Sequence, residues 1–205
     1  MGSGITEINK DTFWQLIEET KNQCGQDMDA SISWIKKELL SMPPEQSLRF
    51  HAIMHGYRDL ADKYGLWTAA IFIKEYGCSD DGFMDFRAWL IAQGKDIYMA
   101  ALENPDSLTR VEQYGDCEFE LLNYVGDYAY QELTGRSAYE DCTPEMEKRV
   151  LEEISGEIKY HPLIEYPLQP PDVAAVYPEI GDMIMKKYSI RFFSKDSSLW
   201  NTSLP

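Results

Sequence analysis

Two histidines stand four residues apart at His51 and His55, and Asp59 follows after another four. On a helix these three side chains share one face, because residues at i and i+4 lie one turn apart. Imidazole nitrogens and carboxylate oxygens are zinc ligands, and three of them could complete a site. The sequence has no His-Glu-x-x-His pattern, however. Two interpretations remain, a metal site or a chance pairing on a solvated helix face, and we favour the second.

A second group that could do chemistry lies between Cys78 and Arg87. Cys78 precedes an expected helix N-terminus, where a thiolate nucleophile would be stabilised, and His51 or His55 would have to act as its base. Arg87 could hold a phosphate or carboxylate, with Asp81 as a further catalytic candidate. This hypothesis describes a small enzyme or an anion-binding pocket. The alternative is that Cys78 is an unreactive buried thiol.

Arg87 also has a structural interpretation. It lies four residues after Phe83 and four before Ile91, so a helix places its guanidinium on or near the buried stripe. A buried charge needs a partner, and removing one member of a buried pair costs about 3–5 kcal/mol. We therefore favour an internal tie between elements over an anion pocket. The candidate partners are Glu118, Glu120 and Asp127.

Three acids near the start of the same segment, Asp80, Asp81 and Asp85, could ligate a hard cation through oxygen. They lack the spacing of a calcium-binding loop. Asp80 or Ser79 would instead cap the helix, and Asp81 lies near the positive end of the helix dipole. Capping explains these residues without a metal, and we favour it.

The elements that carry these groups are expected to be helices, because apolar residues recur at three- and four-residue steps between Gly and Pro residues. The first helix should span residues 12–24 with Asp11 as a cap, and a long helix should span residues 116–133. Residues 66–76 are apolar nearly all round, so a buried strand competes with a helix there. The predicted fold is all-α, a compact single-domain bundle of about seven or eight helices.

The expected organisation has four parts. Residues 1–9 are a disordered N-terminus or a remnant of expression, and residues 10–160 form the helical domain. Residues 161–193 form a Pro-rich strap, with a last helix at 177–188 packed on the domain, because prolines exclude a long helix. Residues 194–205 are a frayed tail. The strap should be held by Leu163, Ile164, Tyr166 and Tyr177.

The formal charge of −16 is unevenly placed, since residues 96–159 contain 16 acidic and 5 basic residues. Such a field repels nucleic-acid phosphate, so direct nucleic-acid binding is disfavoured. A basic protein partner fits the charge. The competing explanation is an acidic surface that only keeps the protein soluble.

The four cysteines lie far apart and include no Cys-x-x-Cys pair, and no signal peptide precedes them. We therefore expect reduced thiols and a cytoplasmic location. No apolar run is long enough to cross a membrane. The sequence shows no phosphate-binding glycine loop, dinucleotide fingerprint or nucleophile elbow, so we expect no cofactor and lean against an enzyme.

Several motifs resemble one family, the bacterial domain of unknown function 4240, over roughly residues 10–135. They are Phe13-Trp14 with Leu16-Ile17, the run Gly77-Cys78-Ser79-Asp80-Asp81-Gly82-Phe83, Phe86-Arg87-x-Trp89-Leu90-Ile91-x-Gln93-Gly94, and Pro105-Asp106-x-Leu108. The resemblance implies a helical bacterial domain and brings no catalytic residues. Its structural signature in this chain is Trp14, Asp80, Asp81, Phe83, Phe86, Arg87 and Trp89.

These observations favour an interaction or regulatory domain, of which an immunity-type protein is one form, that binds a basic partner. The alternative is the enzyme or ligand pocket around Cys78 and Arg87. The third hypothesis is metal binding at His51, His55 and Asp59. The oligomeric state does not follow from the sequence.

Overall fold

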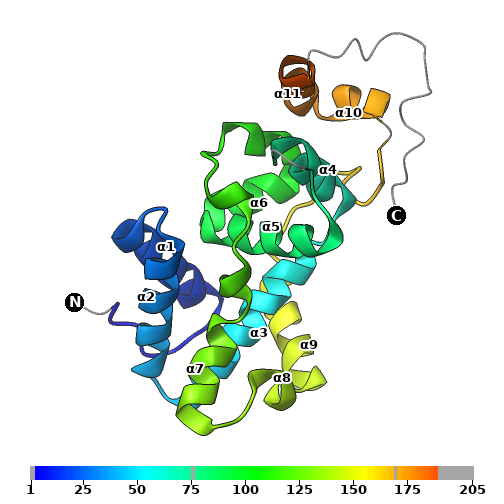
Figure 1. Ribbon diagram of the computed structural model, residues 1–205. Coiled ribbons are helices and arrows are strands. Elements are labelled where there is room, and N and C mark those ends of the chain that lie inside the picture. The colour runs from blue at the N-terminus through cyan, green and yellow to red at the C-terminus, as the bar shows by residue number, and fades with distance from the viewer. Residues whose placement is uncertain (1–2, 75–76, 169, 189–205) are drawn as a thin grey trace.

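The computed structural model describes residues 3–74, 77–168 and 170–188, and within these ranges every regular element is a helix (Figure 1). The all-α prediction is therefore confirmed. The segment that could also have been a buried strand is helix α4. The α-helices are α1 (Lys10–Cys24), α2 (Met28–Leu40), α3 (Pro44–Leu60), α4 (Tyr64–Ile73), α5 (Asp80–Ala92), α6 (Lys95–Glu103), α7 (Val125–Thr134), α8 (Ala138–Asp141), α9 (Pro144–Ser155), α10 (Pro170–Val176) and α11 (Pro178–Tyr188).

Helix α3 is the central element of the fold. It packs against α7, α9 and α2, and also contacts α1, α5 and α8 (Figure 1). Many of its residues are buried, which suits a helix covered on several sides. An aromatic cluster of Phe13, Trp14, Tyr57 and Tyr98 joins α1, α3 and α6, with ring centroids 4.7–5.6 Å apart. One continuous core therefore extends from α1 to α6.

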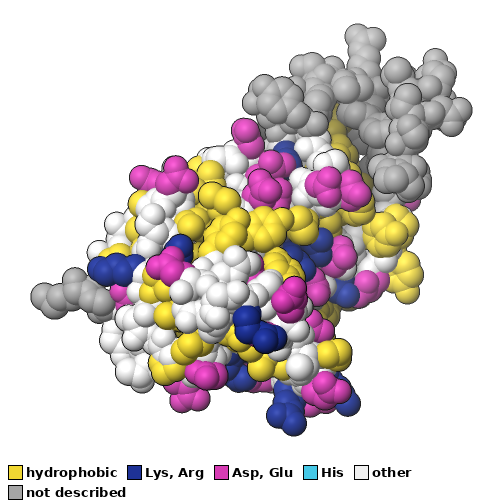
Figure 2. Space-filling model, turned by 60° about the horizontal axis from the view of Figure 1, so that its bottom comes forward, with side chains coloured by type: hydrophobic (Ala, Val, Ile, Leu, Met, Phe, Trp, Pro, Cys, Tyr) yellow, Lys and Arg dark blue, Asp and Glu magenta, His cyan; other side chains and the backbone are white. Residues whose placement is uncertain are grey.

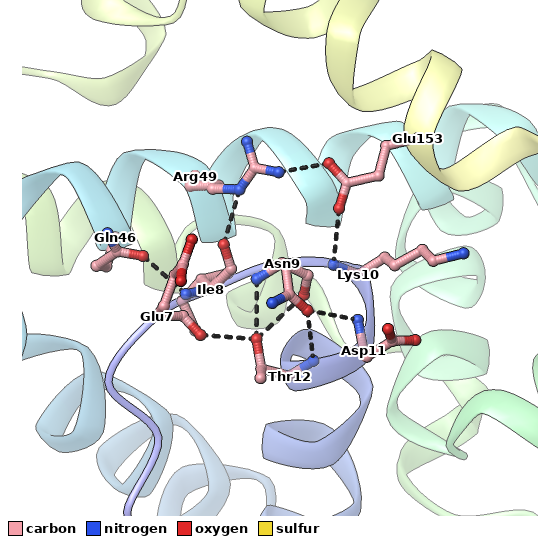
Figure 3. A network of polar contacts seen from close by, with 9 residues as sticks. All are labelled: Glu7, Ile8, Asn9, Lys10, Asp11, Thr12, Gln46, Arg49 and Glu153. Atoms are coloured by element: carbon pink, nitrogen blue, oxygen red, sulfur yellow. Dashed lines mark hydrogen bonds and ion pairs between the residues drawn. The ribbon is translucent and has the colours of Figure 1, made fainter.

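The N-terminal residues 3–9 differ from the expected disorder, because Ile5 and Ile8 are buried in the core. Arg49 Nε donates to the Ile8 carbonyl at 2.7 Å, and the Glu153 carboxylate accepts from Lys10 N at 3.0 Å and pairs with Arg49 (Figure 3). Helix α1 is capped by Asn9, not by Asp11 as expected. The segment before α1 is thus held by α3 and α9.

The expected helix over residues 116–133 is wrong in its first half. The chain there forms two short 3₁₀ segments, η2 (Gly115–Cys117) and η3 (Glu120–Asn123), before α7 begins at Val125. Asp116 and Cys117 have φ values of 55°, which no right-handed helix allows. The Phe119 amide donates to the Asp85 carbonyl of α5 at 3.0 Å. Contact with α5 therefore overrides the local helical pattern.

The last helices lie beyond α4, at the far end from α7 and α8 (Figure 1). A third 3₁₀ segment, η1 (Pro105–Arg110), supplies Asp106, whose carboxylate accepts from Glu179 N and Ile180 N at 3.1 and 3.0 Å. The expected last helix is α11, whereas the preceding α10 was not expected. Ile164 and Tyr177 are buried as expected, but Leu163 and Tyr166 are 39% and 59% exposed.

Expectations for residues 189–205, including the frayed tail, lie outside the described residues. Among the helices of the described ranges, none combines the length and apolar character needed to cross a membrane.

Candidate functional site

The Arg87 side chain is an internal tie. It is 9% exposed, and its Nη1 lies 3.4 Å from Asp62 Oδ2 and donates to the Arg58 carbonyl at 3.2 Å. The guanidinium also lies 4.7 Å from the centre of the Phe83 ring. Burial lowers the pKa of Arg87, and the nearby Asp62 carboxylate opposes this shift. Arg87 therefore joins α5 to the turn between α3 and α4.

The partners expected for Arg87 were wrong. Glu118 pairs with Lys74, and Asp127 accepts from the Ala138 amide at 2.6 Å and from Ser137 Oγ at 2.9 Å. Glu120 is exposed on η3. Asp62 was missed because an exposed acid in a turn gives no periodic signal.

Cys78 is not set up as a nucleophile. Burial raises the pKa of its thiol to about 11, an effect that Lys74 opposes and Glu118 reinforces. This is the reverse of the stabilised thiolate that its position suggested. Ser79 caps α5 by accepting from the Gly82 amide at 3.1 Å, while Asp80 and Asp81 are exposed in the first turn. The first turn of α5 is thus explained by capping.

Acidic side chains gather where α5 meets η2 and η3. We define the α5 acidic face as Asp81, Asp85, Asp116, Glu118 and Glu120. The pKa of Asp85 rises to about 6, first because the carboxyl is partly buried and then because Glu120 and Glu118 are close. Lys74 opposes this shift, and Asn123 Nδ2 donates to Asp85 Oδ1 at 3.2 Å. Glu120, Glu118 and Asp81 therefore all act on the Asp85 carboxyl, and Asp116 belongs to the face through its position on η2, which contacts α5.

A cavity of about 240 Å³ lies between α3, α8 and α9. The rings of His51 and His55 are 4.1 Å apart in its wall, and Tyr139 lies edge-on to both at 4.5 and 5.3 Å. Arg58 and Asp59 complete the α3 side. The residues that α8, α9 and the turn between them contribute are Tyr139, Cys142, Glu147 and Leu151. We call this space the histidine cavity.

The two imidazoles are kept neutral at physiological pH. Burial lowers the pKa of His51 to about 4, against the opposing charge of Asp127, and burial lowers that of His55 to about 3, aided by His51 and Arg58. His55 Nε2 lies 3.2 Å from the Asn123 carbonyl, which can only accept. Nε2 therefore carries the hydrogen, and Nδ1 is left as an acceptor.

His51 is 3% exposed, so the expected solvated helix face is wrong for this residue. Its Nδ1 is buried and has no hydrogen-bond partner among the described residues. An unpaired buried polar group costs about 1–3 kcal/mol. Because Nδ1 is itself buried, it belongs to the packed interior behind the cavity wall.

The metal hypothesis gains no support from this arrangement. Over the described ranges, no group of three or more His, Cys, Asp or Glu side chains is placed to hold a metal ion. Asp59 is exposed and engages Arg58 at 3.2 Å. The three residues at ligand spacing therefore line one cavity without forming a ligand set.

Comparison with known families gives one match, to the model described as Protein of unknown function (DUF4240), over residues 8–132. The chain belongs to this family. The match confirms the resemblance seen in the sequence. Comparisons with curated proteins and with solved structures found no match.

The family match ends inside α7 of this DUF4240 protein, so it covers one wall of the histidine cavity and not the other. His51, His55 and Arg58 lie within the matched residues, whereas Tyr139, Cys142 and Glu147 follow them. Sequence reasoning missed these last three residues. These residues reach α3 only when the chain folds, and no spacing in the sequence predicts that contact.

The buried members of the DUF4240 signature in this chain serve the core. Trp14, Phe83, Phe86 and Trp89 are all at most 3% exposed, and the rings of Phe83, Phe86 and Trp89 stack in series along α5. The signature therefore positions α5 and the Arg87 tie.

Proposed function

We propose that this DUF4240 protein is an interaction domain that binds a basic protein surface through the α5 acidic face. The observation that carries the proposal is the cluster of carboxylates around Asp85, whose pKa is raised to about 6 first by burial and then by Glu120 and Glu118. A cationic partner would relieve their mutual repulsion, which gives the cluster a favourable interaction with basic groups.

The acids of residues 96–159 fall into two groups, according to whether their carboxylates have partners inside the fold. Some are used inside the fold by hydrogen bonds or ion pairs, namely Asp106, Glu118, Asp127, Glu132, Asp141, Glu152, Glu153 and Glu157. The others are all exposed, namely Asp96, Glu103, Glu112, Asp116, Glu120, Glu140, Glu145 and Glu147. The second group, to which Asp116 and Glu120 of the α5 acidic face belong, can meet a partner without breaking a contact inside the fold.

Apolar side chains adjoin the α5 acidic face on η3 and α7. Leu121 and Tyr128 are 41% and 40% exposed, and the Tyr124 ring lies 6.1 Å from that of Tyr128. Figure 2 shows a face of the molecule on which hydrophobic side chains form a band among acidic ones. Exposed aromatic residues beside charge are common in protein interfaces, where they supply contact area while charges steer association.

An internal role for Arg87 removes the main support for the rival pocket around Cys78. The interaction hypothesis is tested by capture of partners from the native host at low and high salt. We expect a basic protein to be retained at low salt and released at high salt, because screening weakens exposed charge pairs. Retention of no protein at either salt concentration would refute the proposal.

A further inference from the structure

We propose that the partner of the α5 acidic face inserts one neutral aromatic side chain into the histidine cavity. This inference rests on the proposed function and names a second contact made by the same partner. A cavity of roughly 150 Å³ holds a benzene ring, so the histidine cavity, at about 240 Å³, has room for one phenyl or phenol ring.

Asn123 of η3 lies between the cavity and the α5 acidic face. Its carbonyl accepts from His55 Nε2 at 3.2 Å, and its Nδ2 donates to Asp85 Oδ1 at 3.2 Å. One residue therefore separates the cavity wall from the centre of the acidic face. A protein interface of ordinary size covers about 800 Å² of each partner, which is enough to span both places.

Exposed tyrosines connect the two places at the surface. Tyr139 at the cavity rim is 48% exposed, and Tyr128 beside the acidic face is 40% exposed. Burial raises the pKa of Tyr139, an effect that Arg58 opposes and that Tyr124 and Tyr128 reinforce, so these tyrosines lie near one another. An aromatic surface thus extends from the α5 acidic face to the rim of the cavity.

The inner wall of the cavity carries no charge. Ala52 and Gly56 are buried there, and burial lowers the pKa of His51 to about 4 and that of His55 to about 3, so both imidazoles are neutral. Burying an unpaired charge is costly. Such a wall excludes the cationic side chains of a basic partner and accepts a neutral one.

The charged residues of the cavity belong to its rim. Asp59 and Glu147 are exposed, and Arg58 is paired with Asp59 at 3.2 Å. A basic residue that flanks the inserted ring can therefore meet Glu147 at the surface. The rim suits the same basic partner as the α5 acidic face.

The rings of the cavity wall favour an aromatic occupant over an aliphatic one. The Tyr139 ring is edge-on to those of His51 and His55 at 4.5 and 5.3 Å. Aromatic rings prefer such edge-to-face contacts, and a further ring can add to them. Buried aromatic side chains are also among the residues that contribute most to protein association.

Small probes test the cavity without the partner. The full chain is titrated with N-acetyl-phenylalaninamide, N-acetyl-leucinamide and N-acetyl-lysinamide, and the imidazole ¹⁵N shifts are followed. We expect the phenylalanine amide to move the His55 signal saturably, and to bind about threefold or more tighter than the other two. The signal of His161, which lies outside the cavity, should stay fixed. The proposal is wrong if the lysine amide binds as tightly as the phenylalanine amide, or if the phenylalanine amide does not bind.

Two leucines of equal exposure then provide matched variants. Leu151 lies at the cavity rim and is 38% exposed, whereas Leu163 lies outside the cavity and is 39% exposed. Leu151→Asn should speed dissociation of the captured partner about fivefold, and Leu163→Asn by less than about twofold, because only Leu151 covers the inserted ring. Neither variant changes the net charge, so the association rate should stay the same in both.

The outcomes separate the two proposals. Equal dissociation rates for Leu151→Asn and Leu163→Asn would refute the insertion. Because the carboxylates of the α5 acidic face are unaltered in both variants, that result would leave the proposed function standing. Capture of no partner would instead refute the proposed function, and the insertion with it.

Discussion

Arg87 and Asp62 form an ion pair whose members differ greatly in exposure. The Arg87 side chain is 10% exposed and that of Asp62 is 62% exposed, with Nη1 and Oδ2 3.4 Å apart. The buried member also donates to the Arg58 carbonyl and packs on Phe83. The pair holds the turn after α3 against α5, and the two partners should contribute unequally to stability.

Arg87→Met should therefore destabilise the fold by about 2 kcal/mol, because it removes the tie and leaves the partly buried Arg58 carbonyl without its donor. Asp62→Asn should cost at most about 1 kcal/mol, because its side chain is largely in water. Urea unfolding measures both. Arg149→Met, at an exposed residue of α9, is the control and should change little. An Arg87→Met variant with an unchanged free energy of unfolding would contradict the structural role of Arg87.

Gly126 marks the closest approach of α7 to α3. A Cβ at this position would lie 3.0 Å from His51 N, Cα and Cβ. Gly126→Ala should cost about 2 kcal/mol, because backbone cannot move away as a flexible side chain would. In the control Gly156→Ala, the added Cβ meets nothing within 4 Å and φ is −66°, so stability should be unchanged or slightly higher. Thermal unfolding should give a clearly lower melting temperature for Gly126→Ala than for Gly156→Ala.

The buried histidines should make the protein sensitive to acid. Their pKa values in the folded state, about 4 for His51 and 3 for His55, lie below the usual 6.5, so the unfolded chain binds protons first. Their contribution is complete above pH 6.5 and is lost as pH falls towards 4, by about 1 kcal/mol per pH unit for each histidine. The free energy of unfolding should fall less steeply in His51→Gln. An equal dependence of the free energy of unfolding on pH in the unchanged protein and in His51→Gln would refute the burial of His51 as a neutral imidazole.

Asp85 should have the opposite effect on stability, which it lowers as the pH rises. Its folded pKa of about 6 exceeds the usual 3.8, so ionisation destabilises the fold as pH rises between these values. Asp85→Asn should raise stability by about 1 kcal/mol at pH 8 and have no such effect below pH 4. Asp96→Asn, at an exposed acid in the first turn of α6, should instead be neutral or slightly destabilising. Chemical unfolding at both pH values compares the variants.

The sequence predicts local structure well where one residue decides it. Ser79 begins helix α5 as its side chain suggests, and Arg87 is buried as its position on the stripe requires. Prediction fails where a distant contact decides. The Phe119 amide bonds to α5 and breaks the expected helix, and Tyr139 reaches His55 across 84 residues of chain. Neither contact has a periodic signal in the sequence.

The central claim, a basic partner on the α5 acidic face, is tested most directly by the association rate of a captured partner at several salt concentrations. The variant Asp81→Asn/Asp116→Asn/Glu120→Gln should slow association at low salt about tenfold or more and flatten its salt dependence. The control Glu7→Gln/Asp29→Asn/Asp172→Asn removes the same charge from exposed residues elsewhere and should have a much smaller effect. Equal rates for the two triple variants would contradict the claim.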